Sequence, residues 1–336
     1  MTKNYFQMII PLVLIIMTSC AHRQADLKPL TFPADMDQPF LSLTNIVGEE
    51  VKTSDSFIGG LALKVKGPQQ LISMARPTAV AIYGENILFV VDADAGEILK
   101  LQYEQGQLKT VMSFGDEWLS APLGIAIWDD IIYISDSQTG QIHRFSLDLE
   151  YLNSLTIQDL QRPGQLKLNT IRNELLVVDT KAHQILAVNA EGDVKATIQN
   201  AGKRKAVLNG PLALDIAPDG KLVVLDALTR RVEFYSQDYA YVGGFGGYDH
   251  VPGSFSNPRG LAVSSDGYIF VSDAAFGNIQ IFDSQGALLY FFGKNGTGRG
   301  EFLMPGALYF DSLNNLYVID QYNNRIQVFN YAVQGG

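Results

Sequence analysis

A single pattern recurs six times between residues 76 and 331, and it limits the folds that this 336-residue chain can adopt. Each copy starts at a proline and reaches, 14 to 16 residues later, an aspartate that ends an apolar run. Successive aspartates lie 44, 43, 47, 47 and 47 residues apart. The prolines are Pro77, Pro122, Pro163, Pro211, Pro258 and Pro305, and the aspartates are Asp92, Asp136, Asp179, Asp226, Asp273 and Asp320.

The clearest copy, residues 258–282, has the sequence of three short strands. Apolar and polar residues alternate within it, and Gly and Asp mark its turns, which is typical of an antiparallel meander. Three strands cannot bury a core by themselves, and a strand-only repeat of about 40 to 50 residues indicates a propeller with one sheet per copy. We therefore predict an all-β fold, a six-bladed β-propeller with four-stranded antiparallel blades that start near residues 76, 121, 162, 210, 257 and 304.

The two ends of the repeated region predict how the ring closes. The last copy stops after its third strand, near residues 329–334, and leaves no room for a fourth. Residues 41–75 contain apolar runs at 41–47 and 57–65 that resemble strands. We expect this region to supply the missing outer strand of the last blade, because such pairing removes exposed sheet edges. A loose N-terminal extension is the alternative.

The first 40 residues have the features of an export segment. Lys3 precedes an apolar run at residues 8–17, which is too short to cross a bilayer comfortably, since that takes about 20 residues. We predict that residues 1–19 are a signal peptide. Residues 20–40 are polar and punctuated by proline, and we expect them to be a tether.

Cys20 is the only cysteine of the chain, which excludes an intrachain disulfide and a cysteine-rich metal site. The segment Met17-Thr18-Ser19-Cys20 resembles a bacterial lipobox, and the resemblance implies cleavage before Cys20 and its diacylation. Ala21 follows where the inner-membrane retention signal has Asp, so the resemblance implies a lipoprotein anchored in the outer membrane, on its periplasmic or extracellular face. An ordinary secretory signal with an incidental cysteine, or a buried helix, is the alternative.

The repeats themselves resemble NHL repeats. The best matches are PRGLAV…YIFVSDAAFGNIQIFD and LYVIDQYNNRIQVF, with the connectors FGGYDHVPGSFSNP and FGKNGTGRGEFLMP. The resemblance covers residues 76 to about 330. With the lipobox and the tether, the layout resembles bacterial six-bladed NHL-repeat lipoproteins. This resemblance implies a role beside other envelope proteins, exported multihaem c-type cytochromes among them.

Residues that recur in every copy are expected to hold the fold. The six aspartates end the same strand, so we expect them to accept backbone hydrogen bonds in the following turn and not to catalyse. Residues 92–97 hint at a calcium loop but lack its distant glutamate, and a turn is the preferred interpretation. No two of the four histidines share a position that could hold one metal. We predict no catalytic residue, no metal site and no cofactor, and leave open a calcium ion in the channel.

The candidate binding residues are at positions where the six copies have different amino acids. Arg259 follows its proline directly, and the NHL resemblance places this position near the channel mouth as an anion or partner contact. Lys167 and Asp215 are charges in adjacent blades, and such charges pair or stay hydrated. A ligand-binding mouth, and a water-filled channel with an ion pair between blades 3 and 4, are both open interpretations. Four residues after each proline the copies have Ala81, Ala126, Lys167, Asp215, Ala262 and Tyr309.

Charge and composition narrow the classes of partner. The formal net charge of −10 argues against nucleic acid. The one dense basic run, residues 202–205, is expected to be a solvated loop. We predict a non-catalytic outer-membrane lipoprotein that serves as a protein-binding platform, in an assembly with multihaem cytochromes or in another envelope assembly; its acidic surface suits lysine-rich partners. The alternatives are a metal-dependent hydrolase or lyase, or a ligand sensor, that uses the channel mouth.

Overall fold

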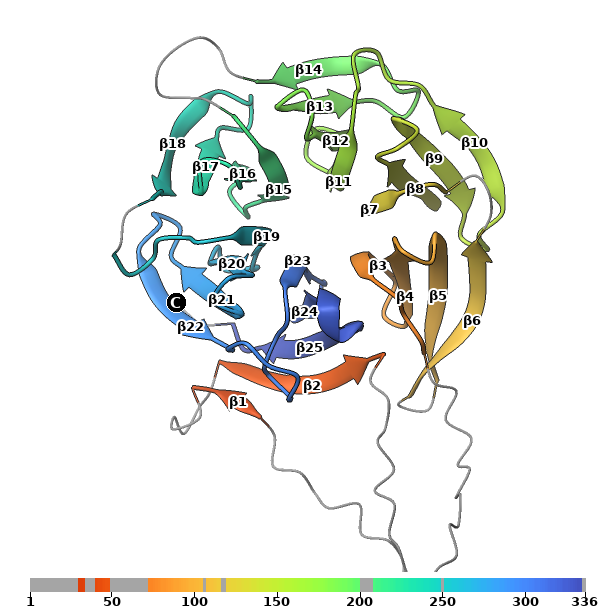
Figure 1. Ribbon diagram of the computed structural model, residues 1–336. Coiled ribbons are helices and arrows are strands. Elements are labelled where there is room, and N and C mark those ends of the chain that lie inside the picture. The colour runs from red at the N-terminus through yellow and green to blue at the C-terminus, as the bar shows by residue number, and fades with distance from the viewer. Residues whose placement is uncertain are drawn as a thin grey trace, which may run out of the picture.

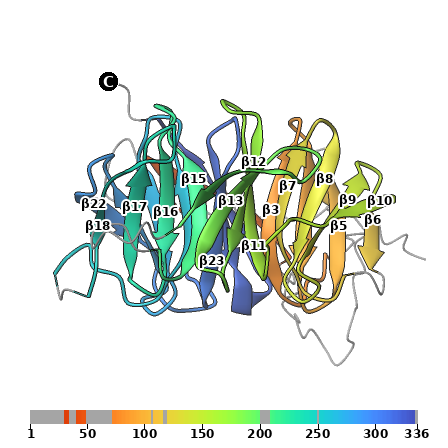
Figure 2. The same cartoon turned by 90° about the horizontal axis from the view of Figure 1, so that it is seen from above.

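A computed structural model describes residues 30–33, 40–48, 72–104, 107–115, 119–199, 208–248 and 251–333. Its strands form six antiparallel sheets arranged around a central axis as the blades of a propeller (Figure 1). In the perpendicular view the strands run between the two ends of the disc, where the turns lie (Figure 2). The predicted all-β, six-bladed propeller is confirmed. Within the described residues no helix is long and apolar enough to cross a membrane.

Blades 1 to 5 each take four consecutive strands, counted from the axis outward. Blade 1 has β3 (Pro77–Tyr83), β4 (Ile87–Asp92), β5 (Glu97–Glu104) and β6 (Gln107–Gly115). Blade 2 has β7 (Pro122–Trp128), β8 (Ile131–Asp136), β9 (Gln141–Ser146) and β10 (Tyr151–Leu155). Blade 3 has β11 (Pro163–Asn169), β12 (Glu174–Asp179), β13 (Gln184–Val188) and β14 (Val194–Ile198). Blade 4 has β15 (Pro211–Ile216), β16 (Leu222–Asp226), β17 (Arg231–Tyr235) and β18 (Tyr241–Gly246); blade 5 has β19 (Pro258–Val263), β20 (Ile269–Asp273), β21 (Asn278–Phe282) and β22 (Leu288–Phe292).

Blade 6 joins the two ends of the described chain. It has β23 (Pro305–Phe310), β24 (Asn315–Asp320), the short 3₁₀ turn η1 (Gln321–Asn323) and β25 (Arg325–Tyr331). Its fourth strand, β2 (Leu41–Val47), pairs antiparallel with β25, so the expected closure by an N-terminal strand is confirmed. A fifth strand that the sequence did not predict, β1 (Thr31–Phe32), lies outside β2. The other expected strand, at residues 57–65, lies outside the described residues.

Buried apolar side chains fill the spaces between neighbouring blades. Between blades 5 and 6, Phe270, Phe292, Phe302 and Phe329 are at most 2% exposed, and they cluster with Leu41 of β2. Burying one such side chain stabilises the fold by about 1.5–3 kcal/mol. The closing strand is therefore held by packing as well as by its ladder of hydrogen bonds.

Each innermost strand is irregular directly after its proline. In β19, Pro258 pairs with Asp273 and Gly260 with Ser272, so Arg259 faces no residue in the register. The register of β3, β7, β11, β15 and β23 shifts at the same point. A bulge bends the strand and changes the direction of the extra side chain. The residue after each proline can therefore turn towards the axis.

Candidate functional site

The six recurring aspartates are buried and hold the turns at one end of the propeller. Asp273 is typical: it accepts hydrogen bonds from the backbone N–H groups of Ser256 (2.6 Å), Asn257 (3.0 Å) and Ala275 (3.1 Å). It thus joins the segment before Pro258 to the turn after β20. We call this end of the disc the proline face; it comprises the residues just before the six prolines and the turns that follow the six aspartates. Backbone amides bind the other five carboxylates in the same way, at Asp92, Asp136, Asp179, Asp226 and Asp320.

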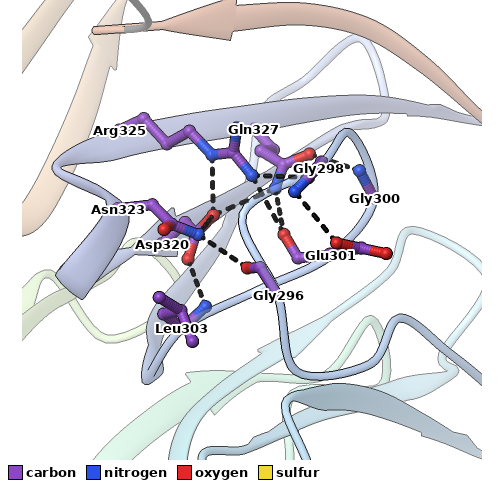
Figure 3. Close-up of polar contacts among 9 residues, drawn as sticks. All are labelled: Gly296, Gly298, Gly300, Glu301, Leu303, Asp320, Asn323, Arg325 and Gln327. Atoms are coloured by element: carbon purple, nitrogen blue, oxygen red, sulfur yellow. Dashed lines mark hydrogen bonds and ion pairs between the residues drawn. The ribbon is translucent and has the colours of Figure 1, made fainter.

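Blade 6 builds a denser network on the same position (Figure 3). Asp320 accepts hydrogen bonds from the backbone of Leu303 and from the side chains of Asn323, Arg325 and Gln327, at 2.7–3.1 Å. Arg325, only 3% exposed, also donates to the carbonyl oxygens of Gly298 and Glu301. The network holds the connector that leads into β23.

A cavity of about 850 Å³ runs along the axis and is lined by all six innermost strands. Lys167, Asp215, Arg259 and Tyr309, the four residues expected at the channel, all line it. They come from blades 3, 4, 5 and 6. Most of the remaining lining is apolar, so these few polar groups decide what the cavity can bind.

Lys167 and Asp215 form an ion pair inside this channel. The distance from Lys167 Nζ to Asp215 Oδ1 is 2.6 Å, and 29% of the lysine side chain is exposed. Asp215 also accepts hydrogen bonds from the backbone N–H groups of Ile216 (2.7 Å) and Val263 (2.9 Å). Since Val263 belongs to β19, one carboxylate links blades 3, 4 and 5. Lys167 Nζ lies 5.7 Å from the centroid of the Tyr309 ring, which belongs to blade 6.

The ionisation of these groups follows from their contacts. Desolvation lowers the pKa of Lys167, but the charge and hydrogen bond of Asp215 more than offset it, so the pKa is raised above that of a free lysine. Burial raises the pKa of Tyr309, and the nearby lysine opposes that shift. At neutral pH Lys167 is therefore charged and Tyr309 is a neutral phenol.

Gln165 is a polar residue of the channel that the comparison of the copies did not single out. Gln165 lies inside the wider bulge of β11, and its Oε1 accepts a 2.6 Å hydrogen bond from the backbone N–H of Leu214 in blade 4. Gln165 thus satisfies a backbone N–H group on the innermost strand of the next blade, as Asp215 does for the backbone N–H of Val263. Both contacts serve the structure.

Three arginines line the proline-face end of the cavity: Arg76, Arg162 and Arg259. Arg76 Nε is 2.7 Å from Asp94 Oδ1. Among the described residues, the guanidinium groups of Arg162 and Arg259 have neither an ion-pair nor a hydrogen-bond partner. Arg76 and Arg162 directly precede prolines, and comparison of that position across the copies would have singled them out.

No metal centre is evident in the described part of the chain, where no three His, Cys, Asp or Glu side chains come close enough to share an ion. His143 is buried, with Nδ1 2.7 Å from Ser154 Oγ and Nε2 3.9 Å from Asp136 Oδ2. Burial lowers the pKa of His143, and Asp136 opposes the shift. His183 is exposed in a turn; His22, His250 and the lipidation candidate Cys20 lie outside the described residues.

The proline face also exposes large apolar side chains on one half. Leu228, Phe276 and Tyr322, in the turns of blades 4, 5 and 6, are 57%, 51% and 63% exposed. Tyr248, 64% exposed, donates a hydrogen bond to the carbonyl oxygen of Leu228, and the Arg230 guanidinium lies 4.6 Å from its ring centroid. We call Leu228, Tyr248, Phe276 and Tyr322 the apolar rim. The corresponding turns of blades 1 to 3, residues 93–96, 137–140 and 180–183, contain no apolar side chain larger than Ala.

Comparison with protein families gives a match to DUF5128, described as a 6-bladed beta-propeller, over residues 259–335. No curated protein matches the chain. Similar solved structures include virginiamycin B lyase from Staphylococcus aureus (13% identity, TM-score 0.58, 77% of this chain and 81% of that one). A gluconolactonase from Xanthomonas campestris (16%, 0.59, 77% and 87%) and the hydrazine synthase of Kuenenia stuttgartiensis (12%, 0.57, 83% and 100%) are also similar. At these identities the similarity shows that this chain shares their propeller fold.

Proposed function

We propose that the protein is a non-catalytic outer-membrane lipoprotein whose propeller, of the NHL type, is a binding platform for another protein. The observation that carries the proposal is the apolar rim on the proline face. Exposed apolar patches on soluble domains mark interaction sites, and aromatic side chains are enriched in protein interfaces. The rim is the surface on which a partner docks.

The aspartate layer beneath the rim supports this assignment. Each turn that presents a rim residue is fixed by a buried carboxylate, as Asp226, Asp273 and Asp320 show for blades 4, 5 and 6. Side chains on a rigid base lose little conformational freedom on binding. Variable turns on a fixed scaffold are the usual place for recognition.

The partner class that we propose comes from the sequence resemblance and from charge. Bacterial lipoproteins of this layout suggest an exported redox assembly with multihaem c-type cytochromes, or another envelope assembly. The net charge of −10 favours encounter with a lysine-rich partner by long-range attraction. The apolar rim then supplies the short-range contacts.

Affinity capture with two matched variants tests the platform. The tagged full-length protein is compared with a rim variant, Leu228→Ser/Phe276→Ser/Tyr322→Ser. The control variant is Ile171→Ser/Leu313→Ser, which removes residues that are 58% and 53% exposed at the opposite end of the disc. We expect the rim variant to lose the co-purifying protein, the control to keep it, and both to retain the wild-type melting temperature. Equal recovery by both variants would refute the platform.

The anchor needs its own test, because it rests on Cys20 and the lipobox resemblance. Cys20→Ala should leave the chain unlipidated and move it from the membrane fraction to the soluble fraction. Unchanged co-sedimentation with outer membranes would show that Cys20 is not the anchor.

A further inference from the structure

The axial cavity has the opposite charge to the chain that encloses it. Its charged lining residues are Arg76, Arg162, Lys167 and Arg259 against Asp215, four positive and one negative, a balance of +3. The whole chain carries −10. A local excess of cations in an acidic protein raises the local concentration of anions.

Two of these cations are not used by the fold. In blade 1 the arginine before the proline is paired, because Asp94 stands in the following turn, 2.7 Å from Arg76. In blade 3 the same two positions are Arg162 and Lys181, two cations that cannot form an ion pair. Arg259, at the bulge of β19, is likewise exposed and unpaired among the described residues. Unlike Arg76, these two guanidinium groups keep their full hydrogen-bonding capacity for a ligand.

The arrangement of the blades brings the arginines to one opening. β3, β11 and β19 alternate with β7, β15 and β23 around the axis (Figure 1). Arg76, Arg162 and Arg259 belong to blades 1, 3 and 5, so they approach the same opening from three sides. Both unpaired guanidinium groups, of Arg162 and Arg259, line the same cavity and are available to an anion that enters it.

The wall below the mouth is mostly apolar, although Thr78 and Gln165 also line it. Between the arginines and the Lys167–Asp215 pair, the cavity is lined by residues such as Leu123, Ile125, Leu212 and Leu261. Ala262, at the level of Lys167, lies three positions after Arg259 along β19, which corresponds to a depth of about 10 Å. The total volume of about 850 Å³ lies within the range of small-molecule pockets.

We propose that the proline-face half of the channel binds a small organic anion. Its carboxylate, or another acidic head group, is held by Arg162 and Arg259, and its apolar body, up to about 10 Å long, occupies the space above the Lys167–Asp215 pair. A medium-chain carboxylate has the required chemistry. This site is separate from the apolar rim, and its occupation does not depend on a protein partner.

Isothermal titration calorimetry of the full chain with octanoate tests the site. Octanol supplies the same apolar body without charge, and inorganic phosphate supplies charge without the body. We expect octanoate to bind with one site per chain and both other probes to bind at least about tenfold more weakly, since a charge-assisted contact accounts for that much. Phosphate binding as tight as octanoate would show a bare anion site, and octanol binding as tight would show an apolar one; either result overturns the proposal, as does no octanoate binding.

Arginine-to-glutamine variants locate the site. Arg162→Gln/Arg259→Gln should weaken octanoate binding by about tenfold or more. Arg299→Gln, which removes an exposed charge that does not line the cavity, should leave it unchanged. Unchanged affinity in the double variant, with a wild-type melting temperature, would refute the proposal. The rim variant described above should bind octanoate normally, so failure of the channel site and failure of the platform give different results.

Discussion

Blades 5 and 6 carry the same aspartate at the same place and use it differently. Asp273 accepts three backbone hydrogen bonds. Asp320 accepts one from the backbone of Leu303 and three from side chains, including the buried Arg325 (Figure 3). The repeat thus determines where the carboxylate lies, and the neighbouring residues determine how much it contributes to the free energy of unfolding.

The difference coincides with the place where the ring closes. Blade 6 takes its outer strands, β2 and β1, from the N-terminal side of the chain. The connector that leads into β23, residues 296–303, is tied to Asp320, Asn323, Arg325 and Gln327. We therefore expect blade 6 to tolerate changes at this position less well than blade 5.

The largest effect is expected from removing the two carboxylates in turn. Asp320→Ala removes the carboxylate that pairs with the buried Arg325 at 2.7 Å, and it should lower the free energy of unfolding by about 3–5 kcal/mol. Asp273→Ala leaves only backbone donors unsatisfied and should cost about 1–3 kcal/mol. Urea denaturation at pH 7 measures both. Equal losses would show that the side-chain network adds nothing to the shared position.

A slightly smaller loss is expected from the closing strand. Leu41 is fully buried against the cluster that contains Phe329 and Tyr331, so Leu41→Ala should cost about 2–5 kcal/mol. Ser42→Ala, on the other face of the strand, should change the free energy of unfolding by less than about 0.5 kcal/mol. If both variants unfold at the wild-type urea concentration, β2 does not hold blade 6.

The contact between blades 5 and 6 gives a third comparison. A Cβ at Gly260 would lie 2.2 Å from the carbonyl oxygen of Gly306, whereas a Cβ at Gly306 would meet no atom closer than 3.7 Å. Gly260→Ala should therefore cost about 1–3 kcal/mol by forcing the blades apart. Gly306→Ala should stay within about 1 kcal/mol of wild type. Thermal unfolding of the two variants distinguishes them, and equal melting temperatures would contradict the close approach.

The smallest effect concerns blade 2, where His143 stands at the position of Gln327. Because burial lowers the pKa of His143, the unfolded chain binds the proton more readily than the folded one. Stability is therefore complete above the unfolded pKa of about 6.5 and falls as the pH drops below it. His143→Gln should reduce the loss of stability between pH 7.5 and 5.5, as measured by urea denaturation. The exposed His183→Asn is the control, and an unchanged pH dependence in His143→Gln would refute this account.

The fold was predictable because the same sequence pattern occurs six times. The proline and aspartate of each copy, and the missing strand of the last one, were sufficient to predict six blades and closure from the N-terminal side. β1 was not predictable, because its two residues, Thr31 and Phe32, are too few to show the alternation of apolar and polar residues that indicates a strand. The hydrogen bond from the backbone N–H of Val263 to Asp215 was not predictable either, because the two residues belong to different blades and meet only in the assembled ring.

The candidate site was predictable where copies could be compared position by position. Lys167, Asp215, Tyr309 and Arg259 were found in this way, and all four line the channel. The apolar rim was missed because Phe276 occupies a different position of its turn from Leu228 and Tyr322, and Tyr248 comes from a connector. Only their exposure and their place on the same face of the disc relate them.

The central claim is that residues shared by all six copies build the propeller, whereas residues that differ between copies on the proline face bind the partner. A hydrogen-exchange map of the captured complex tests this claim most directly. Amide exchange is measured for the protein alone and with the co-purified partner. We expect new protection in the turns of blades 4 to 6 around Leu228, Phe276 and Tyr322, and none in the hairpin turns at the opposite end, near Ile171 and Leu313. Protection confined to that opposite end would contradict it.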